Sequence, residues 1–344
     1  MRIAFISSIY LKHLEQIYIK HECLENRTYT EQYEIIQKEA ISAIGRWPIH
    51  LKEIGIPSIM FCRNNHFIQD TWCKENYFQP KTEDTEFEII LEQVRRYKAT
   101  HLFIFGASYY AHENRLIKIQ SKCPTIRKKI TWYGAPEGNE RIFKEYDLVL
   151  TPSCKLQENL DKLGICTKQI NHAFEPKTFD YLQPRKRKNK ACFIGSMILG
   201  NKWHQERIEY LEILGKNTDL EIYTEISKPT YFLKFKKYIL ETRSNMCKTL
   251  NRFYKRSDRI NYLSDRGNLP IYDNWMGSPL LSKIKGSVYG LDMLNTLSEY
   301  SITFNQHIQL AGDYAGNMRM LEATGLGCAL ITDMKLNLSN FFEP

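Results

Sequence analysis

The chain has 344 residues, of which 43% are hydrophobic, and a formal net charge of +9. This length and hydrophobic content predict a large buried core in two domains, and the lack of an apolar run of about 18 residues excludes a predicted transmembrane helix. The nine cysteines are scattered without a C-x-x-C pair, which argues against a zinc site or disulfide framework and favours reduced thiols in a cytoplasmic protein. The basic charge suggests an anionic partner.

The first half of the chain alternates short apolar runs with amphipathic stretches. The opening run IAFISS predicts a buried strand rather than a secretion signal, and similar runs follow in PSIMFC, HLFIFG, ITWYG and DLVLTPS. Helical patterns such as YEIIQKEAISAIGRW and EFEIILEQVRRY separate these runs. This alternation is typical of βαβ units, which form a parallel sheet that helices cover on both faces.

A polar stretch with two prolines and a run of charges, EPKTFDYLQPRKRKNK, interrupts the alternation. It predicts a linker over 176–190 between an N-terminal domain (1–175) and a C-terminal domain (191–344). Strand and helix patterns then resume in ACFIGS, HQERIEYLEILG, LEIYTE, GLDMLNTLSEY and SITFNQ. The predicted fold class is therefore α/β, with two Rossmann-like doubly wound domains that face each other across a cleft. Ligands of such domains bind at the carboxyl ends of the strands.

The segment 231–266 breaks this pattern and predicts a basic helical insertion in the second domain, over about 230–266. Between Lys234 and Arg259 it has nine Lys or Arg residues and two acids, with apolar residues at roughly helical spacing. Two interpretations stay open: a solvated insertion, or an interfacial helix that binds an anionic membrane surface or an acidic acceptor. The second would place the protein peripherally at the inner face of the membrane. Nucleic acid is not an expected partner, since no recognised binding motif accompanies the charge.

The stretch NMRMLEATGLGCALITD, from Asn317 onward, predicts a helix followed by a strand. Free backbone N–H groups at the start of this helix, around Asn317 and Met318, suit a diphosphate. Arg319 can add a bidentate contact to phosphate oxygens, and Glu322 can accept hydrogen bonds from the two hydroxyls of a ribose. An ordinary helix–strand unit with a surface Glu–Arg pair fits the same residues.

This stretch resembles the donor-site segment of glycosyltransferases with the two-Rossmann GT-B fold, in the family 1-like group that includes spore-maturation (spore-coat type) proteins. YDLVLTPS, INHAFEP, CFIGSM, HQERIEYLE and VYGLDMLNTLSEYSITFNQH resemble segments of the same group in the same order. The resemblance implies transfer of a sugar from a nucleotide diphosphate sugar to a cell-surface glycan, lipid-linked or protein acceptor.

The resemblance also implies roles for particular residues. Glu322 would hold the nucleotide ribose, with Asn317, Met318 and Arg319 near the diphosphate. The loop that follows the first strand of the second domain would also approach the donor. This loop contributes Gly195, Ser196, Lys202, His204 and Arg207. The three basic residues would neutralise the leaving diphosphate, although His204 and Arg207 could equally serve to start a helix.

Two features bear on catalysis. Many relatives carry a second acid eight residues before the donor-helix glutamate, where this chain has Tyr314, next to Asp313. No D-x-D pair lies in a suitable loop, so the resemblance implies an enzyme without a metal or other cofactor. For the acceptor side, His112 and Glu137 follow predicted strands of the first domain and are candidates for a general base.

Other interpretations remain open. A two-domain binding protein of periplasmic-receptor shape would need an export signal, and a non-catalytic assembly or coat-associated protein with a degenerate GT-B fold would explain the missing second acid. Related enzymes continue past the segment that ends at Pro344, so the resemblance implies an incomplete C-terminus. We therefore expect incomplete cover on one face of the second sheet near its last strand, with Phe341 and Phe342 not fully buried.

Overall fold

The computed structural model describes residues 1–111, 114–134, 139–198, 202–225, 235, 238–243, 246 and 279–343. Two of the predicted site residues, His112 and Glu137, lie outside these ranges, as does most of the predicted basic insertion. Within the described ranges, none of the helices combines the length and apolar character that a membrane span requires.

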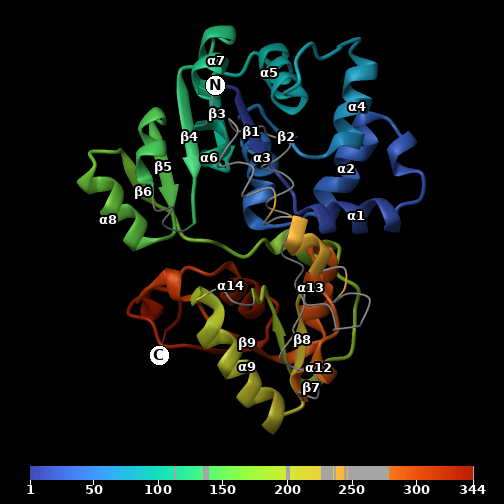
Figure 1. Ribbon diagram of the computed structural model, residues 1–344, viewed down its shortest axis with the longest axis vertical. Coiled ribbons are helices and arrows are strands. Elements are labelled where there is room, and N and C mark those ends of the chain that lie inside the picture. The colour runs from blue at the N-terminus through green and yellow to red at the C-terminus, as the bar shows by residue number, and fades with distance from the viewer. Residues whose placement is uncertain are drawn as a thin grey trace.

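The strands form two parallel sheets, which occupy separate lobes of the molecule (Figure 1). The first sheet has the order β2-β1-β3-β4-β5-β6, formed by β1 (Ile3–Ser7), β2 (Ser58–Cys62), β3 (His101–Phe105), β4 (Lys128–Trp132), β5 (Leu148–Thr151) and β6 (Thr167–Gln169). The second sheet has the order β10-β9-β7-β8, formed by β7 (Lys188–Ile194), β8 (Glu221–Tyr223), β9 (Tyr300–Asn305) and β10 (Ala329–Thr332). The prediction of two α/β Rossmann-like units is confirmed. Because β7 begins at Lys188, the last residues of the predicted linker are already strand.

The helices lie between and around these strands. Those of the first lobe are α1 (Leu11–Lys20), α2 (Tyr29–Glu39), α3 (Ala43–Glu53), α4 (His66–Glu75), α5 (Thr85–Tyr97), α6 (Ala107–Ala111), α7 (Arg115–Lys122) and α8 (Cys154–Lys162). Those of the second are α9 (Gln205–Asn217), α12 (Pro279–Lys283), α13 (Gly290–Ser298) and α14 (Met318–Gly325).

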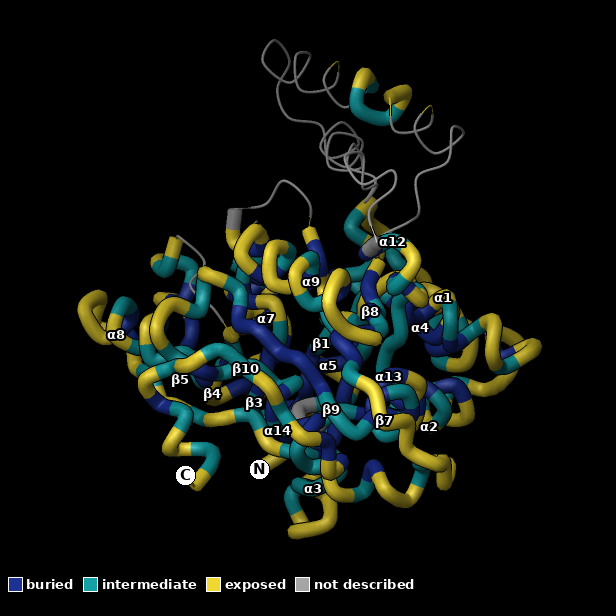
Figure 2. The backbone as a smooth tube through the Cα atoms, turned by 90° about the horizontal axis from the view of Figure 1, so that it is seen from below, coloured by how far each residue is buried: buried dark blue, intermediate teal, exposed yellow. Residues whose placement is uncertain are grey.

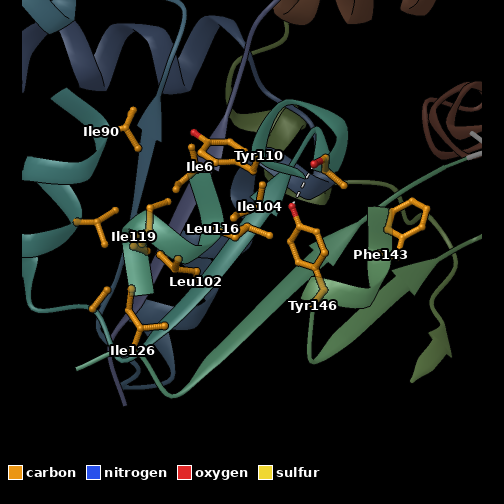
Figure 3. Packing of buried hydrophobic residues seen from close by; sticks show 14 of the residues in the cluster. Ile6, Ile90, Leu102, Ile104, Tyr110, Leu116, Ile119, Ile126, Phe143 and Tyr146 are labelled. Carbon is orange, nitrogen blue, oxygen red and sulfur yellow. Dashed lines mark hydrogen bonds between the residues drawn. The ribbon is translucent and has the colours of Figure 1, made fainter. Parts of the chain in front are cut away.

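Alternate residues of β1 contact opposite faces of the first sheet, as the two-residue period of a strand requires. Ala4 and Ile6 pack with α5, α7 and α8 in one core cluster, whereas Ile3 and Phe5 pack on the α3 side in another. Figure 3 shows the first of these clusters, in which the buried hydroxyl of Tyr146 donates to the carbonyl of Ala107 at 3.3 Å. The central strands β1 and β3 are buried over most of their length (Figure 2). Cover on both faces explains why their sequences are almost continuously apolar.

The second sheet is covered in the same way over most of its area. Cys192 and Ile194 of β7 face α13 and α14, while Phe193 between them faces α9 and α12. At the edge of the sheet, Ile331 of β10 is 56% exposed, and Phe341 and Phe342 are only partly buried. The incomplete cover that the sequence predicts near the last strand is therefore observed.

The two lobes touch where α2 and the residues after it meet α13. Ile41 of the first lobe belongs to the core cluster of the second sheet, and Lys20 of α1 bridges Glu39 and Asp292 at 2.8 and 2.9 Å. At the end of the first lobe, the buried carboxylate of Glu175 accepts from His50 at 2.6 Å. The packing of Ile41 and the Lys20–Asp292 ion pair therefore join the two lobes.

Gly290 lies where the two lobes are in close contact. Its φ is +46°, and a Cβ atom there would lie 2.0 Å from the carbonyl oxygen of Glu39 and 2.6 Å from the His13 ring. We expect Gly290→Ala to lower the free energy of unfolding by about 2 kcal/mol, since a backbone atom cannot yield as a side chain can. Urea unfolding measures the change. Gly55→Ala is the matched control, because Gly55 also has a positive φ, +81°, with nothing within 4 Å; equal losses in both variants would contradict the steric argument.

Candidate functional site

Two adjoining cavities lie between the lobes. The first, of about 400 Å³, is lined by the ends of β7 and β9 and by the start of α14, with Pro152 and Ser153 contributed by the first lobe. The second, of about 460 Å³, is lined mainly by the first lobe. Tyr10 and three residues of α14 line both cavities. We call the first the donor cavity and the second the acceptor cavity, after the sides of the molecule to which the resemblance assigns these two roles.

The donor cavity brings together most of the residues that the sequence predicts for the donor side. Seven of them line it, and they come from three separate parts of the second lobe. They are Gly195, Ser196, Arg207, Asn317, Met318, Arg319 and Glu322. Because all follow the carboxyl ends of β7 and β9, the parallel sheet itself gathers them at one edge.

The start of α14 is held rigidly. The side chain of Asn317 caps the helix by accepting from the N–H of Arg319 at 2.8 Å, and its amide donates to Asn305 at the end of β9 at 2.9 Å. Asn337 forms two hydrogen bonds with the backbone of Ala315, at 2.6 and 2.9 Å. The N-terminus of the helix is therefore fixed in place as part of the cavity wall, with its positive dipole end there.

Arg319 and Glu322 pair with each other. The guanidinium of Arg319 donates to the Glu322 carboxylate at 2.7 Å and to the carbonyl of Ile194 at 3.1 Å, and it also contacts the sulfur of Met293. Glu322 is 6% exposed. The Arg319 side chain turns toward the carboxylate one helical turn away, and its predicted contact with phosphate stays a prediction.

Arg207, near the start of α9, is a buried cation. It is 6% exposed and donates to the carbonyls of Gln306 and Ser196, the latter at 2.9 Å. These three hydrogen bonds leave two of its five N–H groups without a partner, and no carboxylate lies within ion-pair distance among the described residues. Burial lowers the pKa of Arg207 to about 10, and the charge of the Asp333 carboxylate opposes this shift. The cavity wall therefore carries a cation that has no ion-pair partner among the described residues and could pair with a bound anion.

The two other basic residues of the predicted loop behave differently. His204 precedes α9, is 5% exposed and lies outside the lining of both cavities, and burial lowers its pKa, so it is a neutral residue of the helix start. The expectation that it neutralises a diphosphate is therefore not supported by its position. The backbone of Lys202 opens the short 3₁₀ helix Lys202–His204, and its side chain lies outside the described atoms, as do His112 and Glu137.

The sequence analysis missed a histidine in the donor cavity. His307 lines it two residues beyond the end of β9, and its Nδ1 lies 2.8 Å from Asp333, which also accepts from the His307 backbone N–H at 3.0 Å. His307 is 4% exposed, and its Nε2 has no hydrogen-bond partner among the described residues. A polar residue directly after a buried strand was the available signal. The pairing with Asp333, 26 residues later, was not readable from the sequence.

Asp333 provides a pH-dependent contribution to stability. Burial alone would raise the pKa of its carboxyl, but the hydrogen bonds from His307 outweigh burial and hold the pKa well below its usual range. The carboxylate therefore stabilises the fold above about pH 4, and this contribution disappears as the pH falls further. We expect Asp333→Asn to lower the free energy of unfolding by about 2 kcal/mol at pH 7.

Urea unfolding between pH 3 and pH 8 measures this effect. The difference between wild type and Asp333→Asn is expected to shrink below about pH 4, where the unfolded wild type begins to bind a proton at this carboxyl. Asp313→Asn is the matched control, because the Asp313 side chain is exposed. A difference that stays constant with pH would show that His307 does not depress the pKa of Asp333.

The described residues contain no group of three or more His, Cys, Asp or Glu side chains that could hold a metal ion. The basic groups at the donor cavity are Arg207, Arg319 and His307. Of these, Arg319 is neutralised by Glu322, and Asp333 faces His307. The cavity can therefore accept an anion at Arg207, with hydroxyl contacts available at Glu322 and at the unpaired nitrogen of His307.

Part of the chain matches a known protein family. Residues 243–344 match a family model described as "Glycosyl transferase-like". Curated protein sequences contain no match to the chain. The matched segment includes α13, β9, α14 and β10, and thus the Glu322 helix and the His307 loop.

Solved structures with a partly similar arrangement include three proteins of low sequence identity to this chain. A point mutant of S. aureus TarM, solved in complex with UDP, is 11% identical over 76% of this chain and 47% of its own, with a TM-score of 0.40. T4 phage BGT with its UDP-glucose substrate is 10% identical over 97% and 80%, with a TM-score of 0.44. A UDP-glucosyltransferase from Polygonum tinctorium is 9% identical over 96% and 79%, with a TM-score of 0.34.

This chain spans about half the length of TarM. The overlaps are partial, so the fold assignment rests on the strand order and on the two covered parallel sheets. The chain has the two-Rossmann GT-B architecture, and its residues 243–344 carry the glycosyl transferase-like sequence that the resemblance predicted.

Proposed function

We propose that the protein is a glycosyltransferase that moves a sugar from a nucleotide diphosphate sugar to an acceptor hydroxyl. The observation that carries this proposal is the donor cavity, where the start of α14 and the buried Arg207, which has no ion-pair partner among the described residues, line one space. The diphosphate would bind between them, and Glu322 would accept hydrogen bonds from the ribose hydroxyls. The family match over this part of the chain supports the same assignment.

The transfer step needs positive charge at the departing phosphate oxygen and a base for the acceptor proton. Arg207 and the helix dipole of α14 supply the charge in this proposal, without a metal ion. The base would come from the acceptor cavity, where His13 lies beside Tyr289 with ring centroids 5.5 Å apart. Burial lowers the pKa of His13, so its imidazole is neutral at pH 7 and able to accept a proton.

His13→Gln is expected to slow sugar transfer by about 100-fold or more, within the range that general base catalysis contributes. Donor affinity should stay within about twofold, because His13 lines only the acceptor cavity. Transfer rates and nucleotide titration measure the two quantities separately. A variant that transfers sugar at the wild-type rate would remove His13 from the reaction and leave His112 and Glu137 as candidates.

The function itself is tested by turnover of UDP-, GDP- and dTDP-sugars, with and without EDTA. Release of the nucleoside diphosphate is the quantity measured. We expect at least one donor to be hydrolysed or transferred, with no loss of rate in EDTA. The substitution of an acid by Tyr314 favours one alternative, a non-catalytic assembly or coat-associated protein with a degenerate GT-B fold. Failure of the protein to bind or consume any donor would favour that alternative.

The wider partners remain proposals from the sequence. A cell-surface glycan, lipid or protein would supply the acceptor, and the basic segment 231–266 would bind anionic membrane at the cytoplasmic face. Co-sedimentation with anionic and neutral vesicles tests the second idea. Equal binding to both kinds of vesicle would remove its electrostatic basis.

A further inference from the structure

The acceptor cavity has a distinct chemical character. Its volume of about 460 Å³ is within the range of small-molecule sites, and it opens beside the donor cavity at Met318, Arg319 and Glu322. An acceptor bound there would lie next to a sugar attached to the diphosphate. The groups that line this cavity therefore select the acceptor.

Aromatic, aliphatic and sulfur-containing side chains dominate the lining. They come mainly from α2, β2, β3, β4 and α13, which converge here because the strands end at this edge of the sheet. The aromatic members are Tyr10, Tyr29, Tyr33, Phe105, Trp132 and Tyr289. Such surfaces bind rings and hydrocarbon chains by excluding water.

Free charge is absent from the described part of this lining. Its Arg319 and Glu322 neutralise each other at 2.7 Å, and His13 is buried with a lowered pKa. The thiol of Cys62 is also neutral, because burial raises its pKa to about 12. A charged acceptor group would lose its hydration here without gaining a counter-charge.

One polar group in the cavity lacks a partner. The hydroxyl of Tyr289 is buried without a hydrogen bond among the described residues, on the wall beside His13. An unpaired buried hydroxyl is costly, so a ligand hydroxyl that pairs with it would be favoured. The Tyr289 ring lies beside the ring of His13, the proposed base, with centroids 5.5 Å apart.

We propose that the acceptor is an uncharged apolar alcohol or phenol whose ring or hydrocarbon body fills the acceptor cavity. This inference rests on the proposed function and names its acceptor class. In the reaction, the acceptor oxygen bonds to the anomeric carbon, the bond from that carbon to the diphosphate oxygen breaks, and the acceptor proton passes to His13. The nucleoside diphosphate leaves from the donor cavity.

The first test measures the direct binding of 2-naphthol, a neutral phenol, by calorimetry. Ala40, at the end of α2, lines the cavity, so Ala40→Phe should fill part of it and weaken binding at least tenfold. Glu34→Phe adds the same side chain on the exposed face of α2 and should leave binding unchanged. Tyr289→Phe should weaken binding about threefold to tenfold by removing one hydrogen bond. No binding by the wild type, or equal binding by Ala40→Phe, would overturn the proposal.

The second test compares acceptors in the presence of a donor that the protein consumes. 2-Naphthol should be glycosylated with a kcat/KM at least tenfold above that of maltotriose or a glycerol phosphate oligomer. The reverse order would overturn the acceptor assignment while leaving the glycosyltransferase function intact. If the wild type consumes no donor but still binds 2-naphthol, the proposed function is contradicted. UDP titration of Ala40→Phe verifies that this variant keeps its fold.

Discussion

Replacement of Arg207 by methionine is expected to weaken nucleoside diphosphate binding by about 100-fold, which corresponds to about 3 kcal/mol. The guanidinium is buried, lines the donor cavity and has no ion-pair partner among the described residues. A diphosphate is the natural partner for such a fork, since charged hydrogen bonds are stronger than neutral ones. Isothermal titration of the wild type and Arg207→Met with UDP, GDP and dTDP measures the loss.

Two controls separate this role from a structural one. Arg207→Lys keeps the charge but loses the fork, so it should recover part of the affinity. Nucleotide should also raise the unfolding temperature of the wild type, because a bound anion relieves the cost of the buried cation. If Arg207→Met unfolds at the wild-type temperature yet binds nucleotide with unchanged affinity, Arg207 has no part in the donor site.

Glu322→Gln should weaken nucleotide binding by about 10- to 100-fold, because the carboxylate that would accept from the ribose hydroxyls becomes a weaker, neutral acceptor. Glutamine is the informative change, since it fills the same space. Glu322→Ala would leave the Arg319 guanidinium partly buried without its partner, which costs about 3–5 kcal/mol of stability and confuses loss of binding with loss of fold.

The ribose contact gives Glu322 its own signature. The wild type should prefer a ribose nucleotide to its 2′,3′-dideoxy analogue, and Glu322→Gln should show little preference, because the contact to the hydroxyls is already weakened. Titration with UDP and its 2′,3′-dideoxy analogue provides this comparison. A preference that persists unchanged in the variant would place the ribose elsewhere in the cavity.

The α14 segment was readable from the sequence because its signals are local. Asn317, Arg319 and Glu322 lie within one short stretch, and α14 begins one residue after the predicted start at Asn317. The fold class was readable for a similar reason. A buried parallel strand must be apolar on both faces, and an amphipathic helix must follow it. Each βαβ unit can therefore be recognised from the sequence pattern.

Most side-chain partnerships were not readable. The sequence left open whether Arg319 pairs with Glu322 or reaches a phosphate, and its surroundings include Ile194 and Met293, which come from β7 and α13. His307 and Asp333 meet because β9 and β10 are neighbours in the sheet, and the strand order follows from three-dimensional packing. His204 looked basic and available in the sequence, but the start of α9 buries it.

The acceptor side was hidden for a related reason. Its wall combines β1, α2 and the residues around Gly290, which are far apart in the chain and meet only through the contact between the lobes. His13 lies on the first helix of the chain, whose apolar face looks like an ordinary core stripe. Only the approach of Tyr289 from the second lobe turns this face into the wall of a cavity.

In the proposed function, the space between the lobes binds a nucleotide at Arg207 and the start of α14. Calorimetric titration of the wild-type protein with UDP, GDP and dTDP measures this binding. We expect at least one of the three to bind at one site per chain with a Kd below about 1 mM. Heats indistinguishable from dilution for all three nucleotides would contradict it.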